Sequence, residues 1–113
     1  MTRGDVCQAD LNPTKGSEQS GIRPVVVVSR DAINRSSSVV IVVPVTNRAN
    51  KTRLYPSHVE IPKGEGGLSM DSVALCEQVR AISVTSLRAP QGHLQPATVT
   101  RINAALKSAL DLP

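Results

Sequence analysis

PVVVVS at residues 24–29 and SVVIVVPVT at residues 38–46 are the two stretches that decide the fold. Successive β-branched residues are stiff in a helix and pack well on a pleated sheet, so both runs predict strands. Because the runs are continuous rather than alternating, we expect central strands that are covered on both faces. Pro44 lies inside the second run. Since proline donates no hydrogen bond to a strand ladder, we place it at a bulge or near the strand's end.

Shorter strands are predicted on either side of these two runs. Residues 4–10, a segment around 58–61, and residues 70–76 and 78–84 each have a strand-like pattern. Proline and glycine separate them and no helical period intervenes, which favours a β-barrel or sandwich over strand–helix–strand units.

The hydrophobic period changes near the C-terminus. After Pro96, the apolar residues Val99, Ile102, Leu106 and Leu110 follow at spacings of three, four and four. This spacing predicts an amphipathic helix that packs on the barrel, and Pro96 suits the first turn of a helix. The sequence therefore predicts a mostly β fold that ends in an α-helix.

Composition narrows the function classes. The chain has 113 residues, the size of one domain, with a net charge of +4 that mildly favours a polyanionic partner. Aromatic residues are 1% of the chain, so base stacking on aromatic platforms is disfavoured and any stacking should come from arginine or aliphatic side chains. No apolar h-region or membrane-length run is present, so we expect a cytoplasmic protein without a membrane partner. Cys7 and Cys76 are expected to be buried thiols, with one long-range disulfide as the alternative.

Several common catalytic signatures are absent. The sequence has no GxSxG, Walker A or HExxH motif, and its nine acidic residues are scattered. An enzyme with this sequence is therefore expected to work without a metal ion or cofactor.

Two polar residues flank the core strands. Arg23 precedes Pro24, which holds the arginine in extended backbone where a polar loop enters the sheet. A guanidinium mounted there could grip a phosphate with two hydrogen bonds, whereas the structural alternative is an arginine that caps the barrel or pairs with an acid. Thr46 ends the second run, and its hydroxyl could contact a phosphate or only the backbone.

A third candidate group lies between two apolar stretches, at Glu77-Gln78-Val79-Arg80. One interpretation is an acid near a substrate hydroxyl with a guanidinium close by, and the alternative is an internal ion pair of Glu77 with Arg80 or Arg23. His58 could act as an acid–base group, or could simply be a solvated or core-capping histidine.

These residues fall into a pattern that resembles the MazF/PemK-type toxins. The most specific match is Gly16-Ser17-Glu18-Gln19-Ser20-Gly21-Ile22-Arg23-Pro24, and further matches occur in order along nearly the whole chain. Those further matches are Arg3-Gly4-Asp5, Asp10-Leu11-Asn12-Pro13, Asn34-Arg35, Val43-Pro44-Val45-Thr46, His58-Val59-Glu60, Asp71-Ser72-Val73 and Glu77-Gln78-Val79-Arg80.

The resemblance implies one MazF-like domain over residues 1–113, with a small SH3-like β-barrel and a C-terminal helix. It also implies a homodimeric, sequence-specific and metal-independent endoribonuclease (an mRNA interferase) that cuts single-stranded RNA and is neutralised by a cognate MazE-type antitoxin. By position, Arg23 and Thr46 match the family's catalytic pair, and Glu77 is our candidate for the general base. The matching RNA-contacting surface comprises Lys15, Ser17, Glu18, Gln19, Ser20, Asn47, Arg53 and Gln78.

One departure and one competing family qualify this resemblance. A plasmid-borne branch of the family has an arginine two positions before the acid that aligns with Glu77, and a histidine at the position of Ser17. Leu75 and Ser17 stand there in this chain, so that branch's acid–base scheme does not transfer. The alternative is a gyrase-poisoning toxin of the CcdB type, whose final helix ends in Trp-Gly-Ile, whereas this chain ends in Asp111-Leu112-Pro113.

Overall fold

In a computed structural model, which describes residues 1–12, 16, 18–19 and 21–113, the two valine-rich runs form neighbouring central strands. β2 (Ile22–Val27) pairs antiparallel with β3 (Val39–Asn47), and Val25 lies opposite Pro44. The prediction of strands at both runs is therefore confirmed.

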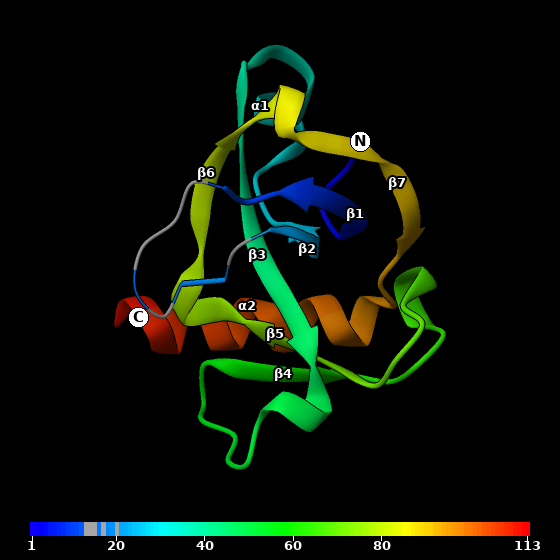
Figure 1. Cartoon of the computed structure of the whole chain (residues 1–113). Helices are drawn as coiled ribbons and strands as arrows, with labels where there is room; N and C mark the ends of the chain where they lie inside the picture. The colour runs from blue at the N-terminus through cyan, green and yellow to red at the C-terminus, as the bar shows by residue number, and fades with distance from the viewer. Residues whose placement is uncertain (13–15, 17, 20) are drawn as a thin grey trace.

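The other strands extend this pair to both sides. They are β1 (Asp5–Asp10), β4 (His58–Ile61), β5 (Ser72–Leu75), β6 (Arg80–Ser83) and β7 (Leu87–His93). Among the described residues, seven strands form an antiparallel sheet in the order β4-β5-β3-β2-β1-β7, with β6 paired to β3 off this path. The sheet curls around the core, as Figure 1 shows, but β4 and β7 do not pair to close it. The mostly β fold class is thus confirmed, and the predicted barrel is an open one.

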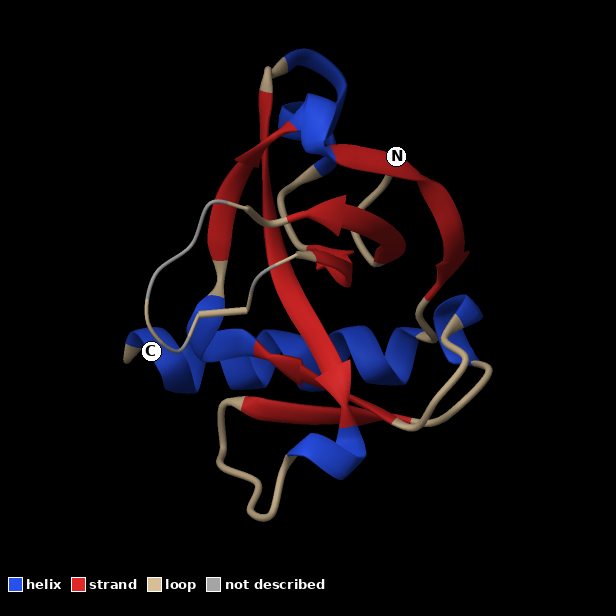
Figure 2. Ribbon diagram, in the orientation of Figure 1, coloured by secondary structure: helices blue, strands red, loops and turns tan. Residues whose placement is uncertain are grey.

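Pro44 marks the point where β3 changes partners. Residues 39–42 of β3 pair with β6, and residues 45–47 pair with β5. Pro44 falls between these two ladders, where the missing N–H of proline breaks no hydrogen bond on that side of the strand. Figure 2 shows β3 as the long strand that runs through both parts of the sheet.

Short helices connect the strands, and one longer helix covers the sheet. α1 (Asp31–Ser36) links β2 to β3, and α2 (Pro96–Leu110) packs against β4 and η3. The remaining single turns are η1 (Arg48–Asn50), η2 (Glu65–Gly67), η3 (Cys76–Gln78) and η4 (Val84–Ser86).

The predicted C-terminal helix is present, with one difference in its buried face. Ile102 is buried and Val99 and Leu106 are partly buried, but Leu110 is 53% exposed because it lies in the last turn, beyond the sheet. At the other end of α2, a Glu65 oxygen accepts a hydrogen bond from the Gln95 backbone N–H at 3.1 Å. This carboxylate satisfies a helix-terminal donor and lies at the positive end of the helix dipole.

The core consists of two clusters of mainly aliphatic side chains, and β3 contributes to both. Val43 and Val45 pack in one cluster, and Val40 and Val42 pack in the other. Val39 and Ile41 are exposed, so the expectation that the whole run is covered on both faces is wrong for the first half of β3. In this half of β3, Val40 and Val42 are buried in the core and alternate with the exposed Val39 and Ile41, which is the pattern of a strand covered on one face.

Both cysteines are buried free thiols, as expected. Burial raises the pKa of Cys76 to about 12, and the nearby Glu77 carboxylate adds to the shift. Cys76 is therefore a protonated, apolar core residue at neutral pH.

β7 and η2 lie in unusually close contact. Gly92 of β7 lies opposite Val6, and the Gly66–Gly67 backbone packs on its other side. The sequence pattern predicts no strand at residues 87–93, because proline and glycine interrupt them. In the structure most of the side chains of β7 are exposed. Among the described residues, no helix has the length and apolar character needed to cross a membrane.

The side chains of Asp5 and His93 also connect β1 to β7. Asp5 Oδ1 lies 2.7 Å from His93 Nδ1, and Asp5 Oδ2 accepts from the Thr2 backbone N–H at 2.8 Å. Partial burial alone would raise the pKa of Asp5, but the hydrogen bonds from His93 and Thr2 outweigh burial and hold it below 3.8.

Candidate active site

Arg23 and Thr46 come together because of the register between two strands. The β2–β3 ladder ends at the pair Val25–Pro44, and Arg23 and Thr46 each lie two residues beyond that pair. Both residues line one cavity of about 180 Å³ at the end of the β2–β3 pair. The structure thus places in one cavity the two residues that the family resemblance implies as a catalytic pair.

Thr46 is a fixed group in this cavity. It is 4% exposed, and its Oγ1 accepts a hydrogen bond from Asn50 Nδ2 at 3.0 Å. A hydroxyl that accepts one hydrogen bond still has its own proton to donate. Sequence reasoning missed Asn50, although it follows Thr46 by four residues across the η1 turn.

The opposite wall of the cavity comes from a segment that was not predicted to line a site. The chain that leaves η2 contributes Leu68, Ser69 and Met70, and β5 contributes Ser72. Ser72 Oγ donates to the Met70 carbonyl at 2.7 Å, which fixes the local turn. Ser72 falls in the Asp71-Ser72-Val73 match, but that match assigned it no role, and Leu68, Ser69 and Met70 carry no motif.

Glu77 lies on η3 and does not line the cavity of Arg23 and Thr46. Its Oε1 accepts from Ser57 Oγ at 3.2 Å, and its Oε2 lies 3.1 Å from His58 Nε2. The side chain of His58 is 4% exposed, whereas that of Glu77 is 40% exposed. Glu77 is therefore paired with His58, a pairing that differs from the internal pair with Arg80 or Arg23 considered from the sequence.

The tautomer of His58 follows from its two hydrogen bonds. The Tyr55 backbone N–H donates to His58 Nδ1 at 3.1 Å, so Nδ1 must be the unprotonated nitrogen. The ring proton of a neutral imidazole is then on Nε2, from which it can be donated to Glu77. A neutral histidine thus holds the Glu77 carboxylate in place.

A second cavity, of about 340 Å³, gathers several of the predicted RNA-contacting residues. Glu18, Gln19, Glu77 and Gln78 line it together. The Gln19 backbone N–H donates to Gln78 Oε1 at 2.9 Å, so the η3 turn also holds part of the polar loop that precedes β2. Gln78 therefore has a structural contact in addition to any role in binding.

The other predicted binding residues are distributed around these cavities. Asn47 lines the cavity of Arg23 and Thr46, and its side chain also accepts from the Ala49 backbone N–H at 2.9 Å to cap η1. Arg53 is exposed, with its guanidinium carbon 6.0 Å from the centre of the Tyr55 ring. Lys15, Ser17 and Ser20 lie outside the described residues.

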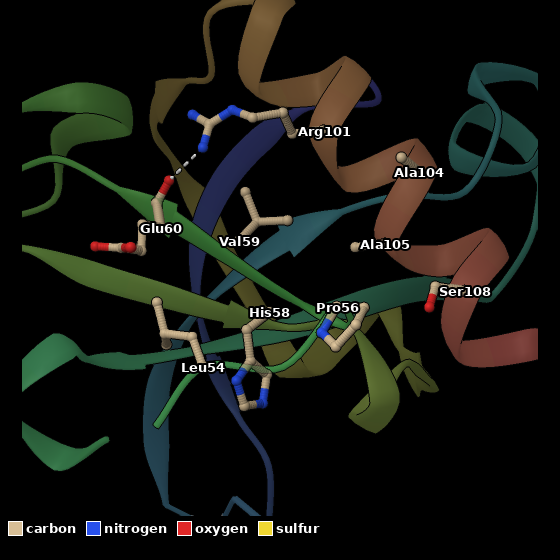
Figure 3. A pocket seen from close by; sticks show the side chains of 9 residues that line it. All are labelled: Leu54, Pro56, His58, Val59, Glu60, Arg101, Ala104, Ala105 and Ser108. Atoms are coloured by element: carbon tan, nitrogen blue, oxygen red, sulfur yellow. Dashed lines mark hydrogen bonds between the residues drawn. The ribbon is translucent and has the colours of Figure 1, made fainter. Parts of the chain in front are cut away.

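A third cavity, of about 460 Å³, lies between β4 and α2 (Figure 3). Arg101 Nη1 donates to the Glu60 backbone carbonyl at 3.1 Å across one end of it. Neither Arg23 nor Thr46 lines this cavity, so it is separate from the candidate catalytic pair. In the part of the chain that the structure describes, no three histidine, cysteine or acidic residues are grouped so that they could hold a metal ion.

Comparisons with known proteins identify the family of this chain. The model of the PemK-like, MazF-like toxins of type II toxin–antitoxin systems matches residues 2–110. An endoribonuclease MazF of Staphylococcus saprophyticus is 44% identical over 112 residues, which cover 99% of this chain and 92% of that protein.

Solved structures give the same result. A mycobacterial endoribonuclease in complex with its cognate antitoxin is 27% identical, with a TM-score of 0.82 over 100% of this chain and 97% of that one. A MazF from Deinococcus radiodurans is 28% identical, with a TM-score of 0.80 over 99% of this chain and 97% of that one. These comparisons do not favour the gyrase-poisoning alternative. The chain belongs to the family of PemK-like, MazF-like toxins of type II toxin–antitoxin systems.

Proposed function

We propose that this chain cuts single-stranded RNA by promoting attack of a ribose 2′-OH on the adjacent 3′ phosphate. Family membership and 44% identity to an endoribonuclease over nearly the whole chain make it an endoribonuclease. The observation that carries the proposed chemistry is the single cavity lined by Arg23 and Thr46. The products would be a 2′,3′-cyclic phosphate and a 5′-OH.

Arg23 is the proposed source of charge stabilisation. As the 2′ oxygen bonds to phosphorus, negative charge grows on the non-bridging oxygens, and a planar guanidinium can donate two parallel hydrogen bonds to them. The extended backbone before Pro24 limits how far Arg23 can move, which preorganises this contact. Because the nucleophile belongs to the RNA, the protein needs no serine or cysteine nucleophile.

Thr46 is the proposed donor to a non-bridging or leaving oxygen. Its Oγ1 accepts from Asn50, which leaves its own proton available to donate to another acceptor. Thr46→Val keeps the shape of the side chain and removes only the hydroxyl. We expect this substitution to slow cleavage by about 10- to 100-fold, the effect of losing one hydrogen bond to a charged group.

Glu77 is the proposed general base, because arginine stays protonated at ordinary pH and threonine is a weak base. This role requires the reacting ribose to lie between the cavity of Arg23 and the cavity of Glu77. Glu77→Gln keeps the size of the side chain that contacts Ser57 and His58. It should lower kcat, because an amide cannot accept the proton that leaves the 2′-OH. An unchanged kcat in Glu77→Gln would show that Glu77 is not the general base.

The central experiment is a cleavage assay with a long RNA, followed by sequencing of the 5′-OH ends. We expect cuts at a reproducible short motif, and a loss of about 10² to 10³ in rate for Arg23→Ala without loss of the folded state. Arg23→Lys is the matched control, because it keeps the charge but not the bidentate geometry. Cleavage by a folded Arg23→Ala protein at the wild-type rate would exclude the proposed role.

Further parts of the proposal concern conditions and partners. We propose that cleavage needs no metal ion, so activity should survive excess EDTA, and complete loss would contradict this. RNA affinity should fall as salt rises, since basic loops bind phosphates. We also propose that the protein is a cytoplasmic homodimer. We propose further that a MazE-type antitoxin neutralises it, because the mycobacterial relative was solved with its cognate antitoxin.

A further inference from the structure

Tyr55 is the only aromatic residue of the chain, which has no tryptophan or phenylalanine. The core is built from valine, leucine and isoleucine, and Tyr55 takes no part in it. Its side chain is 54% exposed on the loop between η1 and β4. A large ring left in solvent adds little to folding, so its location calls for another explanation.

The backbone of Tyr55 is held by two hydrogen bonds to one residue. Its N–H donates to His58 Nδ1 at 3.1 Å, and its carbonyl accepts from the His58 N–H at 2.9 Å. The two rings meet edge to face, with centroids 5.5 Å apart and an angle of 76° between their planes. His58 is in turn hydrogen-bonded to Glu77, so the side chain that contacts the Tyr55 ring is itself held in place.

The loop that carries the ring is basic, although Arg48 within it is paired with Glu60 (Nε to Oε2, 3.5 Å) and the Glu77 carboxylate lies behind His58. The Arg53 guanidinium carbon lies 6.0 Å from the ring centre, within the range of a cation–π contact. Residues 47–57 contain Arg48, Lys51 and Arg53 and no acidic residue. The positive charge of this loop attracts a polyanion such as RNA. It would repel or bind weakly to a protein surface with few acidic residues.

We propose that Tyr55 is a stacking platform for one unpaired base of the bound RNA, with Arg53 beside it for the neighbouring phosphate. This inference rests on the proposed ribonuclease function and adds a binding contact to it. It also revises the expectation from composition that only arginine or aliphatic side chains stack on bases. Through His58 and Glu77, the platform connects to the cavity that Gln19 and Gln78 line.

The test uses Tyr55 as its own reporter, since intrinsic fluorescence of this chain comes from that one ring. Wild-type protein is titrated with a randomised pool of 2′-O-methyl RNA oligonucleotides, which lack the attacking hydroxyl and cannot be cut. A base that stacks on the ring should quench the tyrosine emission in step with binding, which is followed separately by fluorescence anisotropy of a labelled oligonucleotide.

Two variants separate stacking from size and from the phenolic hydroxyl. Tyr55→Phe should bind the pool within about twofold of the wild type, whereas Tyr55→Leu should bind about 5- to 150-fold more weakly. In cleavage of unmodified RNA, Tyr55→Leu should raise KM with little change in kcat, because a base held away from the reacting phosphate is bound equally in the ground and transition states. Melting temperatures of all three proteins should agree, because the ring is outside the core.

The outcomes distinguish this inference from the proposed function. If the wild type cuts RNA but its emission is unchanged on binding, or Tyr55→Leu binds and cuts like the wild type, the stacking inference is wrong and the ribonuclease remains. If the wild type cuts no RNA but binds with quenching, the function fails and the platform remains. If Tyr55→Leu instead changes only the oligomeric state in sedimentation, the ring belongs to a protein interface and the inference is overturned.

Discussion

Gly92→Ala adds only one methyl group, but we expect it to destabilise the protein strongly. A Cβ at Gly92 would lie 2.7 Å from Gly67 N and 2.8 Å from Gly66 O, and closer still to the Gly66 carbonyl carbon. These are backbone atoms, which cannot rotate away as the end of a side chain can. The methyl group must therefore separate η2 from β7 or distort both.

The expected cost follows from this geometry. Overpacking a tight site lowers the free energy of unfolding by roughly 1–3 kcal/mol. Because the atoms that the new methyl group meets are backbone atoms, we expect Gly92→Ala to cost about 3 kcal/mol, the upper end of this range. For a domain of this size, that corresponds to a fall of about 12 °C in melting temperature. The chain after η2 also forms a wall of the Arg23 cavity through Leu68 and Met70, so cleavage should weaken before the protein melts.

The matched control is Gly64→Ala. Gly64 has a φ of +96°, and a Cβ added to it would have nothing within 4 Å, so its substitution costs only the left-handed backbone, about 1–2 kcal/mol. Thermal unfolding followed by circular dichroism measures both variants against the wild type. If Gly92→Ala melts within about 2 °C of the wild type, η2 does not pack on β7 as described and the reasoning is refuted.

Three further predictions concern single contacts. Asp5 has a folded pKa below its usual 3.8, so its contribution to stability is complete above the unfolded pKa and is lost as pH falls through the folded one. The stability advantage of the wild type over Asp5→Asn in urea unfolding should therefore be present at pH 7 and vanish in strong acid, and a constant difference would contradict the pairing with His93. Glu65→Ala should cost about 1 kcal/mol, because it removes the partner of the Gln95 N–H at the start of α2; Glu65→Gln should recover part of this loss in the same denaturant assay. Cys76, whose pKa is raised to about 12 by burial, should resist iodoacetamide at pH 8 in the folded protein and react only when denaturant is added; rapid labelling of the native thiol would show that it is not buried.

Much of the fold was predictable because valine and isoleucine dominate its central strands. Runs of β-branched residues identify β2 and β3 regardless of context, and the period after Pro96 identifies α2. β7 was missed because an edge strand that contains Pro90 and Gly92 has the composition of a loop. α1 was missed because its six residues bury no side chain and so leave no hydrophobic period.

The candidate site was predictable in part, for a related reason. Arg23 lies near the start of β2 and Thr46 near the end of β3, so the antiparallel pairing of these two predictable strands brings both residues to the same end of the pair. Glu77 lies on the η3 turn, whose direction depends on packing against α2 and is not encoded in its own residues. The bond from Asn50 to Thr46 and the ring of Tyr55 depend on turn geometry in the same way.

The change of partner in β3 at Pro44 has a consequence for any attempt to divide this protein. One strand supplies side chains to both core clusters, so neither half of the sheet retains a complete interior without it. Fragments made by opening the chain inside β3 should not refold separately but only by complementation. A circular permutant opened in the exposed turn at Gly64 leaves that shared strand intact and should fold in one cooperative step.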